Sequence, residues 1–361
     1  MADMKKKVNK TTKSNFLTYG MVILIFAVVQ MLSSTGHLSR LLTGLLVPIC
    51  VYTIAAISLN LVVGYSGELS LGHAGFMCVG AYSSALFSHV TSEVLPSVPR
   101  LILAILVGAL VAAVFGVLIG IPVLRLRGDY LAIVTLAFGE IIKNLINVLY
   151  VGMDENGIHV ATSASSLNLA TGGKQIIKGA LGVAGTATLY KDIKGYFFLI
   201  GVILILVALF IVQNLVNSRS GRAITATRDN RIAAESIGIN VTKNKLLAFT
   251  ISAAIAGVAG VLYAHNLSML KVSIFDYNLS ITILVYVILG GIGNLRGTII
   301  ATIILYALPE LLRGFSTYRM LIYAIVMIAM MIFNWAPAAR DFRSRVLDKL
   351  KRNHNHKKEA A

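Results

Sequence analysis

The sequence predicts an all-α integral membrane protein with about ten transmembrane helices. Of its 361 residues, 57% are hydrophobic and only 13% are charged, whereas soluble domains average about 45–50% apolar and about 25% charged residues. The apolar residues form runs close to the length that a helix needs to cross a bilayer. The Lys and Arg residues that give the formal net charge of +17 lie mostly in the two tails and the connections. Positive charges in such positions orient a protein in the membrane, and they argue against nucleic-acid binding.

The predicted spans follow one another closely along the chain. The third and eighth are rich in glycine, and we expect them to be broken or re-entrant. In order, the runs cover residues 16–35, 41–63, 69–89, 100–123, 130–150, 196–216, 245–266, 278–293, 297–313 and 318–335. Together they make one polytopic domain, 16–335, without a separate soluble domain.

Orientation follows from the positive charges. The tails 1–15 and 336–361 are both basic, so both are predicted to be cytoplasmic, which requires an even number of spans. The same count places segment 217–245 in the cytoplasm and segment 151–194 outside. The outer segment is rich in Gly, Ser, Thr and Asn. It is either a mobile surface loop or a docking surface for something that arrives from outside.

Motifs of catalysis are absent from the sequence. It contains no G-x-x-x-x-G-K-[ST] nucleotide loop, no G-x-S-x-G turn and no H-E-x-x-H pair, so we expect no enzymatic activity and no catalytic residue. Cys50 and Cys78 lie inside apolar runs and give neither a metal-binding spacing nor a disulfide framework. We therefore expect no metal site and no cofactor bound by this chain.

Residues 64–82, GYSGELSLGHAGFMCVGAY, contain five glycines. Such a stretch favours a broken helix, whose free N–H groups and positive dipole end suit a ligand carboxylate. The alternative is that the glycines let neighbouring helices approach closely. Within it, His73 either contacts a solute or bridges two helices, and Glu68 is costly inside a membrane unless it lies at a wet cytoplasmic mouth.

A second glycine-rich break, ILGGIGNLRG, covers residues 288–297 in the other half of the chain. Paired breaks of this kind point to a transporter with its pathway between two halves. Between the two breaks, RGDYLAIVTLAFGEIIK at 127–143 places Asp129 at a helix start beside Arg127. Its Glu140 and Lys143 share a helix face, and we favour an intramembrane ion pair over a proton or ion relay.

The longest polar insert runs from Ser218 to Phe249, between the sixth and seventh spans. Its residues 228–237 are predicted to form a short helical unit, which Gly238 ends in a left-handed conformation. An ordinary positively charged loop would explain the Arg and Lys residues, but not a helix of small residues followed by glycine. We expect a cytoplasmic partner to bind this helix.

The insert RDNRIAAESIGINVTKNKLLAFTISAAIAGVAGVLYA resembles the coupling-loop region of permeases of branched-chain amino acid ABC importers. Three further strings resemble that family in its order: LNLVVGYSGELSLGHAGFMCVGAY, RGDYLAIVTLAFGEI and LGGIGNLRGT. The resemblance covers about residues 50–310 and is closest to the larger of the two permease types. One departure is Met153–Ile158, where such permeases often carry a T-G-G-x-x-G-I-type segment.

The resemblance implies the fold, the partners and the site residues. The chain would be a multi-pass permease of the bacterial plasma (inner) membrane, paired with a second, related permease. Two cytoplasmic ATPase subunits would bind the ATP, and an extracytoplasmic binding protein would deliver leucine, isoleucine or valine. The matching coupling residues are Arg228, Asn230, Ala233, Ala234, Glu235 and Gly238. The matching translocation-path residues are Gly67, Ser70, Gly72, His73, Gly75, Phe76, Gly290, Gly291 and Gly293.

Two other functions remain open at this stage. The glycine-broken spans, with Glu68, Asp129 and Glu140, also fit a stand-alone secondary transporter or channel for a small amino acid, urea or an amide. Few charges lie within the spans, which argues against ion coupling. A scaffold or receptor that moves no solute is the third hypothesis.

Overall fold

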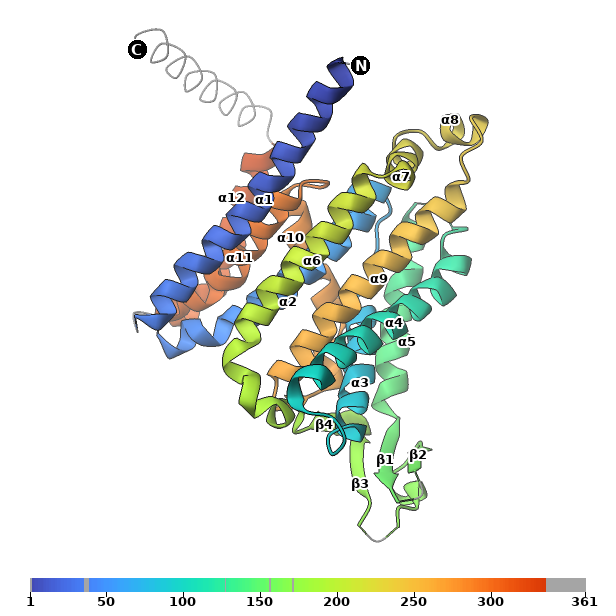
Figure 1. The fold of residues 1–361 in the computed structure, drawn as a ribbon, viewed down its shortest axis with the longest axis vertical. Coiled ribbons are helices and arrows are strands. Elements are labelled where there is room, and N and C mark those ends of the chain that lie inside the picture. The colour runs from blue at the N-terminus through green and yellow to red at the C-terminus, as the bar shows by residue number, and fades with distance from the viewer. Residues whose placement is uncertain (1, 36–38, 127, 156, 171, 336–361) are drawn as a thin grey trace.

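A bundle of long helices makes up most of the protein (Figure 1). The computed structural model describes residues 2–35, 39–126, 128–155, 157–170 and 172–335. The long helices are α1 (Ala2–Ser34), α2 (Arg40–Asn60), α3 (His73–Val90), α4 (Ser97–Val123), α5 (Asp129–Asn147), α6 (Phe197–Asn217), α9 (Val241–Asn266), α10 (Tyr277–Gly290), α11 (Leu295–Leu311) and α12 (Arg319–Trp335). Two short helices, α7 (Arg219–Asp229) and α8 (Arg231–Ser236), join α6 to α9.

Eight helical segments of the described chain are long and apolar enough to cross a membrane. They contain α1, α2, α4, α5, α6, α9, α10 and α11, and so match eight of the predicted spans. The other two predicted spans, 69–89 and 318–335, correspond to α3 and α12, which fall outside this set. The all-α membrane fold is confirmed, whereas the count of about ten spans stays a prediction.

The core forms where α9 packs against α2, α3 and α4. Small residues allow this close approach: a Cβ added at Gly80 of α3 would stand 2.4 Å from the carbonyl oxygen of Gly257 on α9. A Cβ at Gly260 would stand 2.0 Å from the carbonyl oxygen of Met77. At Gly80, therefore, glycine serves helix packing, as the alternative interpretation of the first glycine-rich segment expected.

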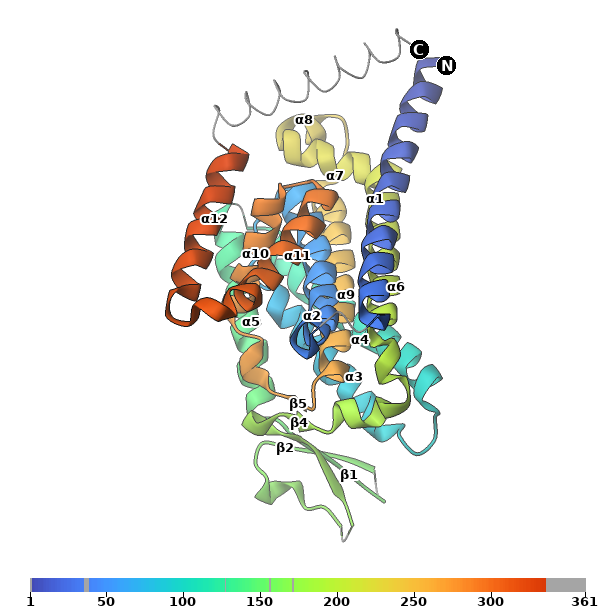
Figure 2. The same ribbon diagram turned by 90° about the vertical axis from the view of Figure 1, so that its left-hand side faces the viewer.

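The N-terminal helix α1 begins at Ala2, so the predicted tail 1–15 mostly continues the first span as helix. α1 packs against α6, and only 11% of its span is buried. It therefore lies at the edge of the bundle (Figure 2). The predicted C-terminal tail, 336–361, lies outside the described residues.

The predicted outer segment contains four of the five strands of a small antiparallel sheet. The strands of this sheet are β1 (Tyr150–Asp154), β2 (Gly157–Ala161), β3 (Lys174–Lys178), β4 (Val183–Ala184) and β5 (Met269–Leu270), in the order β2-β1-β3-β4-β5. Val151, Ile177 and Val183 are buried against the bundle. Segment 151–194 is thus not one irregular loop, because these apolar side chains anchor its strands. The departing motif Met153–Ile158 forms the β1–β2 turn, of which Asn156 is not described.

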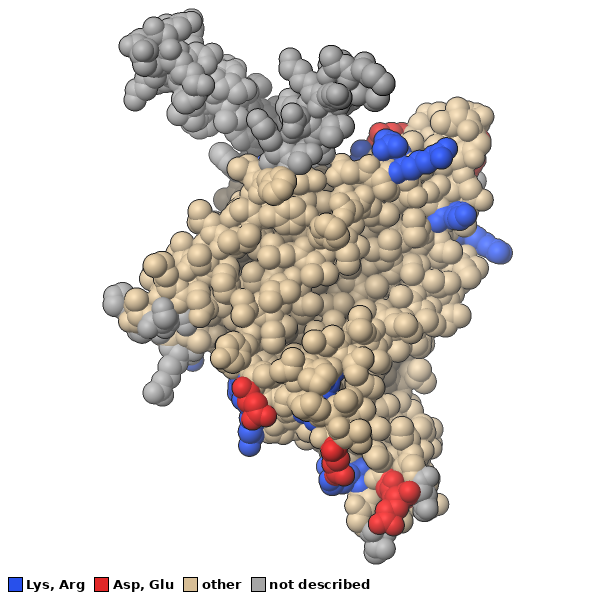
Figure 3. Space-filling model, viewed as in Figure 1, with Lys and Arg blue, Asp and Glu red and all other residues tan. Residues whose placement is uncertain are grey.

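The sheet and the α7–α8 pair lie at opposite ends of the bundle, here named the sheet end and the coupling end (Figures 1 and 2). The start of α1 and the end of α12 both lie at the coupling end (Figure 2). Figure 3 shows Lys, Arg, Asp and Glu side chains gathered towards the two ends of one face, with an uncharged band between them. That arrangement fits a protein that crosses a bilayer between the two ends.

Candidate coupling site and translocation path

The insert at the coupling end contains two helices that meet at a sharp bend. The predicted single helical unit over 228–237 is wrong. Arg228 belongs to α7, whereas Asn230 is extended (φ −153°) and is the N-cap of α8. The Asn230 side chain accepts a hydrogen bond from the Ala233 N–H at 3.0 Å. The break therefore follows from N-capping by asparagine, which stabilises a new helix start.

Two isoleucines are exposed on α8 and directly after it. Ile232 is 80% exposed and Ile237 is 75% exposed, while Ala234 is buried against the bundle. Arg231 and Glu235 form an ion pair one turn apart at 2.8 Å. Gly238 has φ +82°, which confirms the predicted left-handed helix end. A short, internally fixed helix that exposes two isoleucines is suited to docking rather than to free solvation.

Arg228 joins α7 to the first glycine break. Its Nη1 donates a hydrogen bond to the Gly64 carbonyl oxygen at 2.8 Å. Gly64 lies in a π-helical turn, Leu61–Ser66, that follows α2, and Gly67 ends the turn with φ +72°. A Cβ at Gly67 would stand 2.5 Å from Arg228 Cγ. The arginine side chain therefore packs directly on the break.

Glu68 is paired rather than solvated. Its carboxylate contacts the Lys245 ammonium near the start of α9, and each side chain is only 12% exposed. The Glu68 carboxylate, which would be costly inside a membrane, is thus neutralised by the Lys245 ammonium. This ion pair adds a second link between the first glycine break and the helix that follows the insert.

The second break separates α10 from α11. Gly291 and Gly293 have φ of +98° and +77°, and Asn294 caps α11 by accepting from the Gly297 N–H. Gly290 packs against α11, since a Cβ there would stand 2.4 Å from Thr298 Cα. Both glycine-rich segments are therefore true helix breaks.

Asn60, at the end of α2, connects the two breaks. Its Oδ1 accepts from the Gly293 N–H at 2.8 Å, and its Nδ2 donates to Thr298 Oγ1 at 2.7 Å. The side chain is fully buried. Asn60 is not among the predicted site residues, although an asparagine inside an apolar run is itself a signal for an interhelical hydrogen bond.

His73 bridges helices in this conformation. Its Nε2 is hydrogen-bonded to Ser252 Oγ of α9 at 2.9 Å, and its Nδ1 lies 3.4 Å from Ser70 Oγ. Ser252 and Ser58 in turn bond to each other's backbone carbonyl oxygens. The geometry favours the interhelical interpretation of the histidine over direct contact with a solute.

The start of α3 is packed closed by protein. Cβ atoms at Gly72 and Gly75 would stand 2.6 Å from the Thr135 carbonyl oxygen and 2.9 Å from Gly139 Cα, both on α5. Phe76 packs edge-on against Phe249, with ring centroids 5.5 Å apart.

Two of the N–H groups that were expected to be free at this break have protein partners. Leu71 N–H donates to Thr135 Oγ1 and Ala74 N–H donates to Ser280 Oγ, both at 3.0 Å. The open carboxylate site that the sequence suggested is therefore not formed in this conformation, because two hydroxyl groups occupy its donors.

Glu140 and Lys143 form the predicted ion pair on α5, at 2.6 Å. Their side chains are 29% and 23% exposed, so each keeps some access to the surface of the isolated chain. Asp129 begins α5 as expected, and Arg127 lies outside the described residues.

The predicted residues thus lie at four places in the structure. Arg228 touches the first break, Asn60 ties that break to the second break through Gly293, and Ser70 to Phe76 are enclosed between α3, α5 and α9. Ala233 and Glu235 of α8, and Gly238 after the helix, are exposed at the coupling end. Two part-buried hydrogen bonds thus connect α7 to the first break and the first break to the second.

Comparison with known proteins identifies the family. Residues 41–333 match the family model described as "Branched-chain amino acid transport system / permease component". The chain belongs to this permease family. The permease is 38% identical over 298 residues to the high-affinity branched-chain amino acid transport system permease protein LivM of Salmonella typhimurium, covering 80% of this chain and 67% of that protein.

Two further relatives agree. LivM of Escherichia coli is 37% identical over the same shares of the two chains. A probable branched-chain amino acid transport permease protein LivM of Methanocaldococcus jannaschii is 24% identical, over 74% of this chain and 80% of that protein. No solved structure matches the chain. The permease is accordingly a non-catalytic, multi-pass protein of the inner membrane.

Proposed function

We propose that this permease forms half of the translocation path of an ATP-driven ABC importer for leucine, isoleucine and valine. The observation that supports it most is the link from the insert to both helix breaks: Arg228 bonds to Gly64, and Asn60 bonds to Gly293. A stand-alone transporter does not need a cytoplasmic helix pair that is hydrogen-bonded to its broken spans.

The proposal includes three kinds of protein partner. Two ATPase subunits act at the coupling end. One of them contacts the exposed Ile232 of α8 and Ile237, which caps the end of that helix. A second, related permease completes the path, and an extracytoplasmic binding protein docks at the sheet end. ATP is bound by the ATPases, so this chain needs no cofactor of its own.

The mechanism is a two-state change driven from the coupling end. Closure of the ATPases displaces α7 and α8, and the Arg228 side chain carries the movement to the π-helical turn that ends at Gly67. Through its bond to Gly293, Asn60 would move the α10–α11 break together with that turn. Moving such an equilibrium from 1:99 to 99:1 takes about 5.5 kcal/mol, which ATP turnover can supply.

The solute is inferred from chemistry and from the relatives' names. A small apolar amino acid needs an apolar cavity and one carboxylate site. The donors at Leu71 and Ala74 are held by Thr135 and Ser280 in this conformation. Carboxylate binding would therefore require α5 and α10 to move away from the start of α3, which ties solute access to the same conformational change.

Uptake in a defined system tests the function. The permease is co-expressed with candidate partner subunits, reconstituted in liposomes and supplied with labelled leucine, with and without internal ATP. We expect accumulation only with ATP and ATPases. Ile232→Asp should abolish ATPase co-purification and uptake, whereas Ile158→Asp, a matched change at the exposed surface of β2, should leave ATPase binding intact. Uptake without ATPases would support the stand-alone transporter instead.

A further inference from the structure

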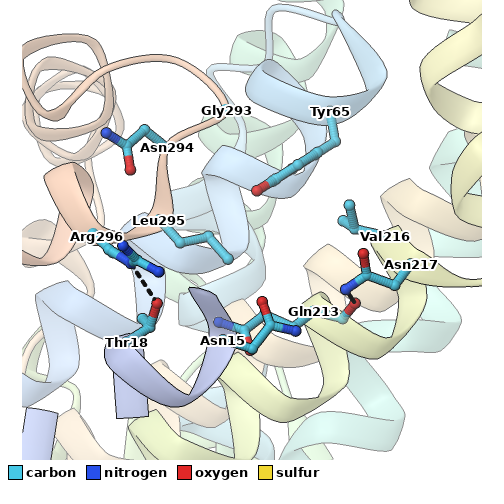
Figure 4. Close-up of a pocket in the computed structure, with 10 residues that line it drawn as sticks. All are labelled: Asn15, Thr18, Tyr65, Gln213, Val216, Asn217, Gly293, Asn294, Leu295 and Arg296. Carbon is cyan, nitrogen blue, oxygen red and sulfur yellow. Dashed lines mark hydrogen bonds between the residues drawn. The ribbon is translucent and has the colours of Figure 1, made fainter. Parts of the chain in front are cut away.

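A polar cavity opens at the coupling end beside α1. It has a volume of about 260 Å³ and lies between α1, α6, the first break and the start of α11 (Figure 4). Its lining includes the amides of Asn15, Gln213 and Asn217 and the guanidinium of Arg296. Arg296 Nε donates to Thr18 Oγ1 at 2.7 Å, and this bond holds the guanidinium beside α1.

One group in this cavity lacks a donor. Gln213 is only 6% exposed, and its buried Oε1 has no hydrogen-bond partner within the described structure. A buried amide oxygen without a donor is costly, so such groups are normally satisfied by something bound. The cavity therefore calls for an occupant that carries a hydrogen-bond donor.

An apolar groove continues from the same arginine. Its volume is about 850 Å³, and it is lined by Phe16, Leu17, Gly20, Met21, Leu24 and Ile25 of α1 together with Arg296. Leu17 and Leu24 are both 64% exposed in the isolated chain. Arg296 thus lines both a polar cavity and an apolar groove, and the groove follows α1 from Phe16 to Ile25.

We propose that an anionic phospholipid with a hydroxylated headgroup, such as phosphatidylglycerol, binds here. Its phosphate would pair with Arg296, a headgroup hydroxyl would donate to Gln213 Oε1, and an acyl chain would lie along α1. The sequence before Asn15 is basic, and basic segments beside a membrane attract anionic lipids. The lipid would fasten α1, which is weakly packed, to α11 and the second break.

Lipid retention by the full-length protein tests this site. Protein extracted in mild detergent is examined by native mass spectrometry for bound phosphatidylglycerol and phosphatidylethanolamine. Wild type should hold phosphatidylglycerol above its share of the membrane lipids. Arg296→Gln should lower retention about fivefold, the factor expected for about 1 kcal/mol per basic residue at a membrane surface. Arg296→Lys should restore most of it.

Two further variants separate charge from shape. Lys243→Gln removes an exposed cation from the same end and should retain as much lipid as wild type. Gly20→Phe keeps the charge but fills the groove, where a Cβ at Gly20 meets nothing within 4 Å, and should lower retention. Equal retention in Arg296→Gln and Lys243→Gln would overturn the proposal. So would a bound lipid mixture that matches the membrane, or a cross-link from Leu24→Cys to a second permease.

Discussion

Arg228 on α7 donates a hydrogen bond to the Gly64 carbonyl oxygen at 2.8 Å, across 164 residues of sequence. Gly64 itself lies against Gly293, since a Cβ there would stand 2.5 Å from the Gly293 nitrogen. One side chain of the insert therefore reaches the point where the two helix breaks meet. This contact is the physical basis of the proposed coupling.

Arg228→Ala should uncouple transport without releasing the ATPases. The variant removes the charge-assisted hydrogen bond to Gly64, worth about 1.5–3 kcal/mol, and the packing on Gly67. It also removes an exposed ion pair with the neighbouring Asp229, which contributes little. ATP-dependent leucine uptake should fall by about tenfold or more, while ATPase co-purification stays at the wild-type level. Arg222→Ala is the matched control, because Arg222 is exposed and bonds only within its own segment, to the Asn217 carbonyl oxygen. Equal uptake by the two variants would refute the linkage.

Asn60→Leu should destabilise the junction of the two breaks. It leaves the half-buried Gly293 N–H without its acceptor and removes the Asn60 donor from the buried Thr298 hydroxyl, which keeps its bond to the Asn294 carbonyl oxygen. We expect the free energy of unfolding to fall by about 1–3 kcal/mol. Unfolding in detergent, followed by circular dichroism, measures the change. Asn244→Leu removes an exposed amide that bonds to the Asn240 carbonyl oxygen, and its stability should change little. An unchanged free energy of unfolding in Asn60→Leu would show that this junction does not contribute to stability.

Gly80→Ala should loosen the core. The new Cβ would stand 2.4 Å from the Gly257 carbonyl oxygen, so α3 and α9 must separate, at a cost of about 1–3 kcal/mol. Gly44→Ala offers the matched control, because nothing lies within 4 Å of its Cβ position and alanine is the better helix former. Thermal unfolding of the two variants should therefore shift in opposite directions. A melting temperature that rises in both variants would argue against close helix packing at Gly80.

His73→Ala should affect stability rather than solute affinity. The histidine and Ser252 share one buried bond, so His73→Ala and Ser252→Ala should each lower the free energy of unfolding. The double variant should lose less than the sum of the two, by about 0.5–2 kcal/mol. The KM for leucine uptake should stay near the wild-type value. A KM that rises in His73→Ala but not in Ser252→Ala would assign the histidine to the solute.

Hydropathy and glycine patterns account for the parts of the structure that could be predicted. The long apolar runs became helices because a backbone in lipid must satisfy its own hydrogen bonds. Gly67, Gly238 and Gly291 ended helices because each adopts a positive φ that other residues avoid. These features depend on local chemistry, which a single sequence displays.

Features set by distant partners escaped prediction. The sheet depends on Val151, Ile177 and Val183 meeting the bundle and on β5 arriving from residue 269. Asn60 gains its role only because Gly293 lies beside it, 233 residues later. The donors at the start of α3 seemed available for a ligand until α5 and α10 supplied hydroxyl groups. Such pairings are tertiary and leave little mark on the local sequence.

Cysteine cross-linking at α8 tests the central claim most directly. Cys50 and Cys78 are buried, so Ile232→Cys introduces a thiol that is reactive at one exposed position. In intact cells this thiol should resist a membrane-impermeant reagent, react with it in inside-out vesicles, and form a cross-link to an ATPase subunit that changes in yield when ATP is trapped. Labelling of the thiol from outside intact cells, or a thiol that contacts no ATPase subunit in any nucleotide state, would contradict the account.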